Sequence, residues 1–209
     1  MKNKSFWILL TAGVLCFLLA GAVYLFGGIS EELTDTINYR QTGNGGKITN
    51  ETSITQSFFC KYNDITSLLM RTSTLGNTYE AGHALFTLYN EKGDKIARQE
   101  IPLSEIKDKG AVIFSFGEKI EKTGGQVLTF KAEAREMEND KCYSLMIGQG
   151  NVGGMLTTAD GKTSENNSLF MTMNYLNPVK PISATFLFLI AGMVFLSLLP
   201  LMGSKKGGC

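Results

Sequence analysis

Few side chains in this sequence have the chemistry that catalysis or metal binding requires, and they do not form a recognisable set. His83 is the only histidine, so it cannot build a zinc site of several nitrogen and sulfur ligands. No serine lies in a G-x-S-x-G pattern, and the glycine-rich segment 44–48 (NGGKI) lacks the Ser or Thr that follows lysine in a phosphate-binding loop. We interpret His83 as a surface residue at a strand edge, and we predict no catalytic residue, no metal site and no cofactor.

Four carboxylates lie close together in the segment 133–140, namely Glu133, Glu136, Glu138 and Asp140. Carboxylate oxygens are the ligands that calcium prefers, but this spacing matches no 12-residue calcium-binding loop. We favour a solvated turn between two strands, because charged side chains are seldom buried. An enzyme that uses these carboxylates remains a less favoured alternative.

Two of the four cysteines, Cys60 and Cys142, fall in predicted strands of the central region. On the oxidising side of a membrane these two thiols are able to form a disulfide, which would close a loop of 82 residues (142 minus 60). Strand alternation does not decide the matter, since Cys60 shares a face with Phe58 whereas Cys142 lies opposite Tyr143. The sequence therefore leaves the disulfide open.

Two uncharged apolar stretches flank these residues, at 6–28 and 182–203, with lengths of 23 and 22 residues. Each is long enough for a helix to cross a hydrocarbon core, which takes about 20 residues. The alternative for the first stretch is a cleaved signal peptide, but the apolar part of such a peptide has only about 7 to 15 residues. The sequence therefore predicts two transmembrane helices.

Charged residues around the stretches predict the topology. Two lysines precede the first stretch, Lys205 and Lys206 follow the second, and all 19 acidic residues lie between them. Because basic residues collect on the cytoplasmic side, we expect a plasma-membrane protein with both termini cytoplasmic. The predicted parts are a cytoplasmic tail (1–5), a helix (6–28), an extracytoplasmic domain (29–181), a helix (182–203) and a cytoplasmic tail (204–209).

Small residues recur along both predicted helices and leave shallow surfaces on which another helix can pack. The residues concerned are Ala12, Gly13, Cys16, Ala20 and Gly21 in the first helix and Gly192 in the second. The partner is open at this point: it is the other helix of the same chain, a second copy of the chain, or another membrane protein.

The central region has the residue pattern of an antiparallel β-sandwich. Apolar and polar side chains alternate with period two in eight short segments, several of them separated by glycine-containing turns. The predicted strands are 53–62, 67–75, 83–90, 95–103, 111–116, 126–134, 142–148 and 168–176. Eight strands at this spacing indicate two facing sheets. Outside the strands, 30–38 is predicted to be helical and 103–109 to be turn-like.

The most regular strands each have one face that we expect to point into the core. The predicted core residues are Ala84, Phe86, Leu88, Val112, Phe114, Phe116, Leu128, Phe130, Ala132, Tyr143, Leu145 and Ile147.

The central region holds 16 basic residues, which is 20 minus the four tail lysines, and 19 acidic ones, for a net charge of −3. Such a balance gives no electrostatic reason to bind nucleic acid.

Between residues 52 and 148 the sequence contains, in this order, a Gln-x-Phe strand (Gln56, Phe58), a turn at Gly93 and Asp94, a connector at 101–106 and a Tyr-x-Leu-x-Ile strand (Tyr143, Leu145, Ile147). This order of features resembles a small jelly-roll module of bacterial membrane proteins of cell-surface polysaccharide synthesis and export. In that family the module looks like a carbohydrate-binding sandwich. The resemblance thus implies a jelly-roll-like fold and a glycan ligand, but no individual sugar-contacting residue.

These observations predict a mainly β protein whose outer sandwich is flanked by two transmembrane helices. The expected function is that of a non-catalytic binding or accessory module that acts with machinery of cell-surface glycan synthesis or export. The alternatives are a structural subunit of a membrane complex and, less favoured, an enzyme subunit. The expected partners are the lipid bilayer, another membrane protein or a second copy of the chain, and a glycan.

Overall fold

The computed structural model describes residues 2–27, 29–37, 40–179 and 182–199, and its contacts divide the chain into two units. Unit 1 consists of Met1–Glu31 and Pro178–Cys209 and contains two helices. Unit 2, Glu32–Asn177, contains two sheets. The predicted cytoplasmic tail at 204–209 lies outside the described residues.

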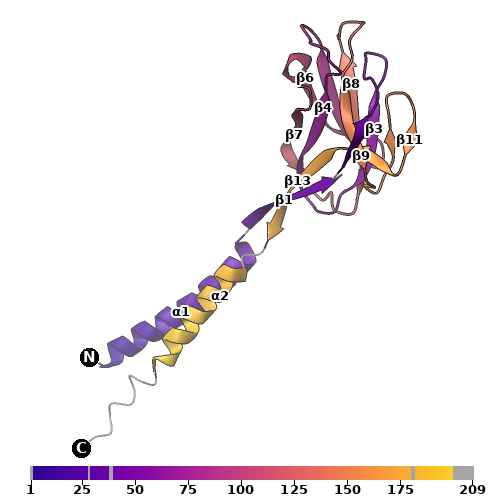
Figure 1. Ribbon diagram of the computed structural model, residues 1–209. Helices are drawn as coiled ribbons and strands as arrows, with labels where there is room; N and C mark the ends of the chain where they lie inside the picture. The colour runs from indigo at the N-terminus through magenta and orange to yellow at the C-terminus, as the bar shows by residue number, and fades with distance from the viewer. Residues whose placement is uncertain (1, 28, 38–39, 180–181, 200–209) are drawn as a thin grey trace, which may run out of the picture. The chain divides into compact units, whose positions relative to one another are not determined.

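In unit 1, the helices α1 (Lys2–Phe26) and α2 (Ile182–Ser197) lie side by side (Figure 1). The part of α1 from Phe6–Phe26 is long and apolar enough to cross a membrane, and a signal sequence has the same properties. α2 has 16 residues and is about 24 Å long, which is less than the roughly 30 Å of a hydrocarbon core. The structure thus contains one apolar helix of spanning length and one shorter apolar helix, and residues 200–203 of the second predicted span lie outside the described part.

The first sheet of unit 2 has the strand order β1-β13-β4-β9-β12, with β2 paired to β9 and β7 paired to β4. The strands are β1 (Ile29–Ile37), β2 (Gln41–Asn44), β4 (Ile65–Ser73), β7 (Ala111–Ile120), β9 (Ser144–Gln149), β12 (Asn167–Leu169) and β13 (Met171–Val179). The pairings with a described register are antiparallel.

The second sheet has the order β11-β10-β3-β8-β5-β6, and its pairings are antiparallel as well. The strands are β3 (Ile54–Phe59), β5 (His83–Tyr89), β6 (Lys95–Pro102), β8 (Val127–Arg135), β10 (Leu156–Thr157) and β11 (Thr163–Ser164). A short 3-10 helix, η1 (Leu103–Glu105), follows β6. Unit 2 is therefore a mainly β protein of two antiparallel sheets that form a sandwich, as the sequence predicts.

The core lies between the two sheets, where the alternating apolar rows meet. Phe86 and Phe130 from one sheet pack with Phe114 from the other, with ring centroids 5.6 to 6.0 Å apart. Nine of the twelve predicted core residues are fully buried, and Val112, Phe116 and Ile147 are partly buried against the same cluster. The period-two pattern thus identifies the inner face of most of the strands.

Gln56, the polar residue of the Gln-x-Phe motif, is fully buried and joins the two sheets. Its Oε1 accepts a hydrogen bond of 3.1 Å from the Leu169 amide on β12, and its Nε2 donates to the Ser57 carbonyl at 2.7 Å. Burying a side-chain amide is costly unless its polar atoms are hydrogen-bonded. Gln56 therefore connects β3 to β12 by a hydrogen bond and also fills space in the core.

The predicted helix at 30–38 is wrong, because Ile29–Ile37 forms the strand β1 beside β13. Leu33 and Asp35 are partly buried while Thr34 and Thr36 are exposed, so the side chains alternate as in a strand. The Thr36 and Thr172 hydroxyls lie 3.2 Å apart across the pair. Pairing with β13 here overrides a weak local preference for a helix. A short polar segment does not reveal such a long-range pairing by itself.

Candidate functional site

Cys60 and Cys142 are free, buried thiols, so the disulfide that the sequence left open is not formed in the structure. The Cys60 amide donates to the Gln126 carbonyl just before β8, whereas the Tyr143 hydroxyl, one residue after Cys142, donates to the Glu133 carbonyl near the end of β8. Gln126 and Glu133 are seven residues apart along the same extended segment, which corresponds to roughly 23 Å. A disulfide needs Cα atoms within about 7 Å, so these two cysteines are too far apart.

Each thiol has its own polar neighbours. Burial raises the pKa of the Cys60 thiol to about 12, although a hydrogen bond with the Tyr175 hydroxyl opposes that shift. Near Cys142, the Asn77 side-chain amide and the Tyr79 hydroxyl both donate to the Cys142 carbonyl, at 2.8 Å each. Because a reactive cysteine is accessible and has a lowered pKa, Cys60 has the features of a structural residue.

The predicted helix-packing residues lie on different faces of unit 1. A Cβ added at Gly13 would come within 3.0 Å of Leu196, and one added at Gly192 within 3.0 Å of Phe17. Ala20 is buried, Ala12 and Cys16 are partly buried, and Gly21 is exposed with nothing within 4 Å of an added Cβ. Gly13 and Gly192 thus lie where α1 and α2 approach each other, while Gly21 lies on another face.

His83 is the first residue of β5, an inner strand between β8 and β6 rather than an edge strand. It is half-buried, and it pairs in register with Pro102 and Arg135. Among the residues that the structure describes, no group of three or more His, Cys, Asp or Glu side chains is placed to hold a metal ion.

The carboxylates of segment 133–140 do not converge on one point. Glu133 forms an ion pair with Lys131 at 2.6 Å, and Glu138 forms one with Lys141 at 2.6 Å. The Lys141 hydrogen bond and the Glu80 and Ala81 backbone amides lower the pKa of Glu138, although partial desolvation raises it. Glu138 therefore connects the turn after β8 to the loop at Glu80 and Ala81. The sequence indicates only a solvated turn here and does not reveal this contact.

A polar hollow of about 360 Å³ lies between this turn and the segment that precedes β3. Its lining residues carry amides, carboxylates, a hydroxyl and an ammonium group, and they are Thr49, Asn50, Glu51, Glu138, Asn139 and Lys141. Glu51 and Asn139 are exposed. Such a set of closely spaced donors and acceptors suits a ligand with many hydroxyl groups.

Two local hydrogen-bonded structures build the walls of the hollow. The Asn50 side chain forms two bonds with Met137, donating to its carbonyl at 2.7 Å and accepting from its amide at 3.1 Å. In the preceding turn, the Thr52 hydroxyl donates to the Lys47 carbonyl at 2.6 Å and accepts from the Thr49 amide at 2.9 Å. Sequence reasoning identified the carboxylates of one wall but missed the 49–51 wall, which lies almost 90 residues earlier in the chain.

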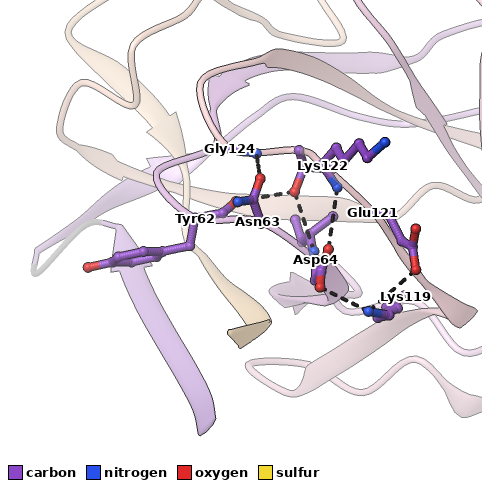
Figure 2. A network of polar contacts seen from close by, with 9 residues as sticks. Tyr62, Asn63, Asp64, Lys119, Glu121, Lys122 and Gly124 are labelled. Carbon is purple, nitrogen blue, oxygen red and sulfur yellow. Dashed lines mark hydrogen bonds and ion pairs between the residues drawn. The ribbon is translucent and has the colours of Figure 1, made fainter. Parts of the chain in front are cut away.

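The opposite end of the β3 and β8 pair carries a second polar network, centred on Asp64 (Figure 2). Asp64 accepts from the Lys119 ammonium at 2.9 Å and from the Lys122 amide at 3.3 Å, while the Asn63 side chain accepts from the Gly124 amide at 3.0 Å. Asp64 and Lys122 have left-handed φ angles of 58° and 57°, which are uncommon outside glycine. The network thus holds the loops 60–64 and 121–126 together.

No protein-family model and no curated protein sequence matches this chain. Among solved structures, the chain is similar to structures of infectious bursal disease virus from the Gx strain (12% identity, TM-score 0.31) and the Gt strain (12%, 0.23), and to its VP2 subviral particle (11%, 0.24). The matches cover 85%, 85% and 83% of this chain and 50%, 49% and 46% of the viral chains. The chain thus spans about half the length of these viral proteins.

Proposed function

We propose that this chain is an integral membrane protein whose two helices span the bilayer and hold a non-catalytic binding sandwich on the extracytoplasmic side. The observation that carries this proposal is the outer surface of the helix pair, where large apolar side chains are exposed on both helices. On α1 they include Trp7, Leu18 and Leu25, and on α2 they include Phe186 and Leu187. In water such a surface would be unfavourable, whereas lipid tails cover it at no cost.

The aromatic side chains of α1 fit the two membrane interfaces. Trp7 and Tyr24, both exposed, are 17 residues apart, which corresponds to about 26 Å along a helix. This distance is close to the thickness of a hydrocarbon core, and Trp and Tyr collect at its two boundaries. A signal sequence has no need of aromatic residues at that separation, so the spacing favours a retained span.

The second span is supported by the sequence that continues after α2. From Ile182 the chain has no charged residue through Gly203, and Lys205 and Lys206 follow. An uncharged run of this length, if helical, is able to cross a bilayer, and the lysines favour a cytoplasmic C-terminus. Both termini are then on the same side, and the sandwich is on the other.

The sandwich binds a hydroxyl-rich ligand, of which a glycan is the preferred example, in the polar hollow at 49–51 and 138–141. Support comes from the donors and acceptors of the hollow and from the resemblance of segment 52–148 to modules of polysaccharide synthesis and export. In this role the protein acts as an accessory to a membrane partner that makes or exports the glycan.

Binding of the full chain, purified in mild detergent, to an array of bacterial surface glycans tests this function. We expect Glu51→Gln and Asn139→Ala to weaken binding roughly twofold to twelvefold, because Asn139→Ala removes a hydrogen bond of about 0.5–1.5 kcal/mol and Glu51→Gln removes the charge that strengthens one. Glu118→Gln, an exposed carboxylate on β7, is the matched control and should bind like the wild type. Equal binding by all three variants would contradict the assignment of the hollow, and an array without any bound glycan would contradict the ligand class.

A further inference from the structure

We infer that one end of the sandwich, formed by the segment 59–64, rests on the membrane surface and places Phe59 and Tyr62 among lipid headgroups. This inference rests on the proposed function, since it requires that the helices lie in a bilayer. It adds a lipid-contacting surface to the sandwich, at the end opposite the polar hollow.

Segment 59–64 directs two aromatic rings outward around a buried cysteine. Phe59 and Tyr62 are 42% and 40% exposed, while Cys60 between them is fully buried. Together with Lys61, the two aromatic residues form a short aromatic-Lys-aromatic surface, which we call the aromatic edge. Large apolar side chains with a lysine between them are typical of segments that lie in a membrane interface.

The aromatic edge is rigidly supported, so its rings do not need to become ordered on contact with lipid. Tyr62 packs edge-on against the buried Tyr175, with ring centroids 5.5 Å apart. Phe59 lies beneath Gly153, where an added Cβ would come within 2.8 Å of the Phe59 Cβ. In Figure 2 the Tyr62 ring points away from the Asp64 network, whose hydrogen bonds fix the loop behind it.

The covalent connection to α2 limits how far this end of the sandwich can lie from the first residue of α2. The Leu176 amide, on the strand that leaves unit 2, donates to the Asp64 carbonyl at 2.8 Å. Only six residues of chain lead from Leu176 to Ile182, where α2 begins, and even fully extended they span no more than about 22 Å. If Ile182 lies at the membrane boundary, Leu176 and the Asp64 carbonyl bonded to it lie no more than roughly 25 Å from that boundary, and a tilt of the sandwich brings the aromatic edge to the headgroups.

The charges around the aromatic edge favour a lipid surface without a particular charge. Lys61 is paired with Asp35 at 2.8 Å, and Lys119 with Asp64 and Glu121 at 2.9 and 3.4 Å. Balanced pairs of this kind give little net attraction to anionic lipid. Apolar contact by the two rings is therefore the main attractive interaction, and we expect it with zwitterionic phosphatidylcholine as well.

Fluorescence quenching by brominated lipid tests the inference on the full chain. In liposomes of phosphatidylcholine brominated near the carbonyl end of its acyl chains, the double variant Trp7→Phe/Tyr62→Trp has its single tryptophan on the aromatic edge. We expect its emission to fall at least twofold relative to unbrominated liposomes, and to be shifted to the blue. The matched control is Trp7→Phe/Ile113→Trp, because Ile113 is also exposed but pairs with Leu69, which lies four residues, or roughly 13 Å, along β4 from Ile65, the residue that follows segment 59–64. Its emission should not change.

The outcomes separate failure of this inference from failure of the proposed function. The wild type has Trp7 as its only tryptophan, so quenching of its emission reports whether α1 is in the bilayer. If Trp7 is not quenched, the membrane proposal itself fails. If Trp7 is quenched but the Tyr62→Trp variant is not, or is quenched no more than the Ile113→Trp control, the sandwich does not rest on lipid and this inference alone is overturned.

Discussion

At the scale of single residues, buried and partly buried polar groups stabilise the sandwich. Gln56 joins the two sheets, Glu138 fixes the turn after β8, and Cys60 is a buried thiol beside the Tyr175 hydroxyl. Each of these groups has its described partners within the protein, so each is used for structure. The proposed ligand would meet mainly the exposed groups of the polar hollow, such as Glu51 and Asn139, whereas Glu138 in its wall is held by Lys141.

Replacing Gln56 by leucine removes a side-chain hydrogen bond between β3 and β12. We expect Gln56→Leu to lower the free energy of unfolding of unit 2 by about 1–3 kcal/mol, because the Leu169 amide loses this acceptor in a dry core. Denaturant unfolding of the full chain in detergent, followed by near-UV circular dichroism, measures the change. Thr55→Ala, on the outer face of the same strand, is the control and should stay within about 0.5 kcal/mol. A Gln56→Leu variant as stable as that control would contradict the role of this residue.

Alkaline pH should destabilise unit 2 because its buried acids resist losing their protons. Burial is the main cause that raises the pKa of Cys60 and of Tyr79 to about 12, from ordinary values of 9.0 and 10.0. Above pH 9 the unfolded chain therefore binds fewer protons than the folded one, so stability is complete below pH 9 and falls progressively toward pH 12. Unfolding free energies measured at pH 8 and pH 10.5 check the sign. Cys60→Ala should lose less stability between pH 9 and 10, and a wild-type profile that stays flat above pH 9 would contradict the account.

At the scale of elements, the sequence predicts those strands whose alternating face is buried along their whole length. β5 and β8 fit this rule, and their predicted bounds differ from the observed ones by a residue at most. β10 and β11 have two residues each, too few for any alternation to be visible. β1 was predicted as a helix because its pairing with β13 is made by residues more than 130 positions away. The wall of the polar hollow at 49–51 was not predicted for the same reason, since Asn50 and Met137 are 87 residues apart in the sequence.

The contact between α1 and α2 depends on the absence of a side chain at Gly192. A leucine there would collide with Phe17, so we expect Gly192→Leu to destabilise the helix pair by about 1–3 kcal/mol. Thermal melting in mild detergent, followed by the helical signal at 222 nm, should show a lower midpoint for this variant. Gly21→Leu is the matched control, because an added Cβ at Gly21 has nothing within 4 Å. Equal midpoints for the two variants would show that the helices do not pack through Gly192.

At the scale of the whole molecule, we propose that the two ends of the sandwich have different contacts, one with lipid and the other with a hydroxyl-rich ligand. The end at 59–64 is connected through a few residues to α2 and carries exposed aromatic rings, whereas the end at 49–51 and 138–141 carries the polar hollow. On the proposed topology, the sandwich is attached to the membrane through both its first and its last strand, and its ligand must then lie near the membrane. Such a module suits a ligand that emerges from the membrane or from a partner within it.

The central claim is that both helices cross the bilayer and that both termini are cytoplasmic. Labelling with a membrane-impermeant maleimide tests it most directly, with the reactive positions Asn3→Cys and Cys209 located by peptide mapping in the same cells. We predict that both positions react only after the membrane is permeabilised, and that the peptide with residue 3 remains part of the mature protein. Labelling of either position in intact cells, or loss of the N-terminal peptide, would contradict the claim.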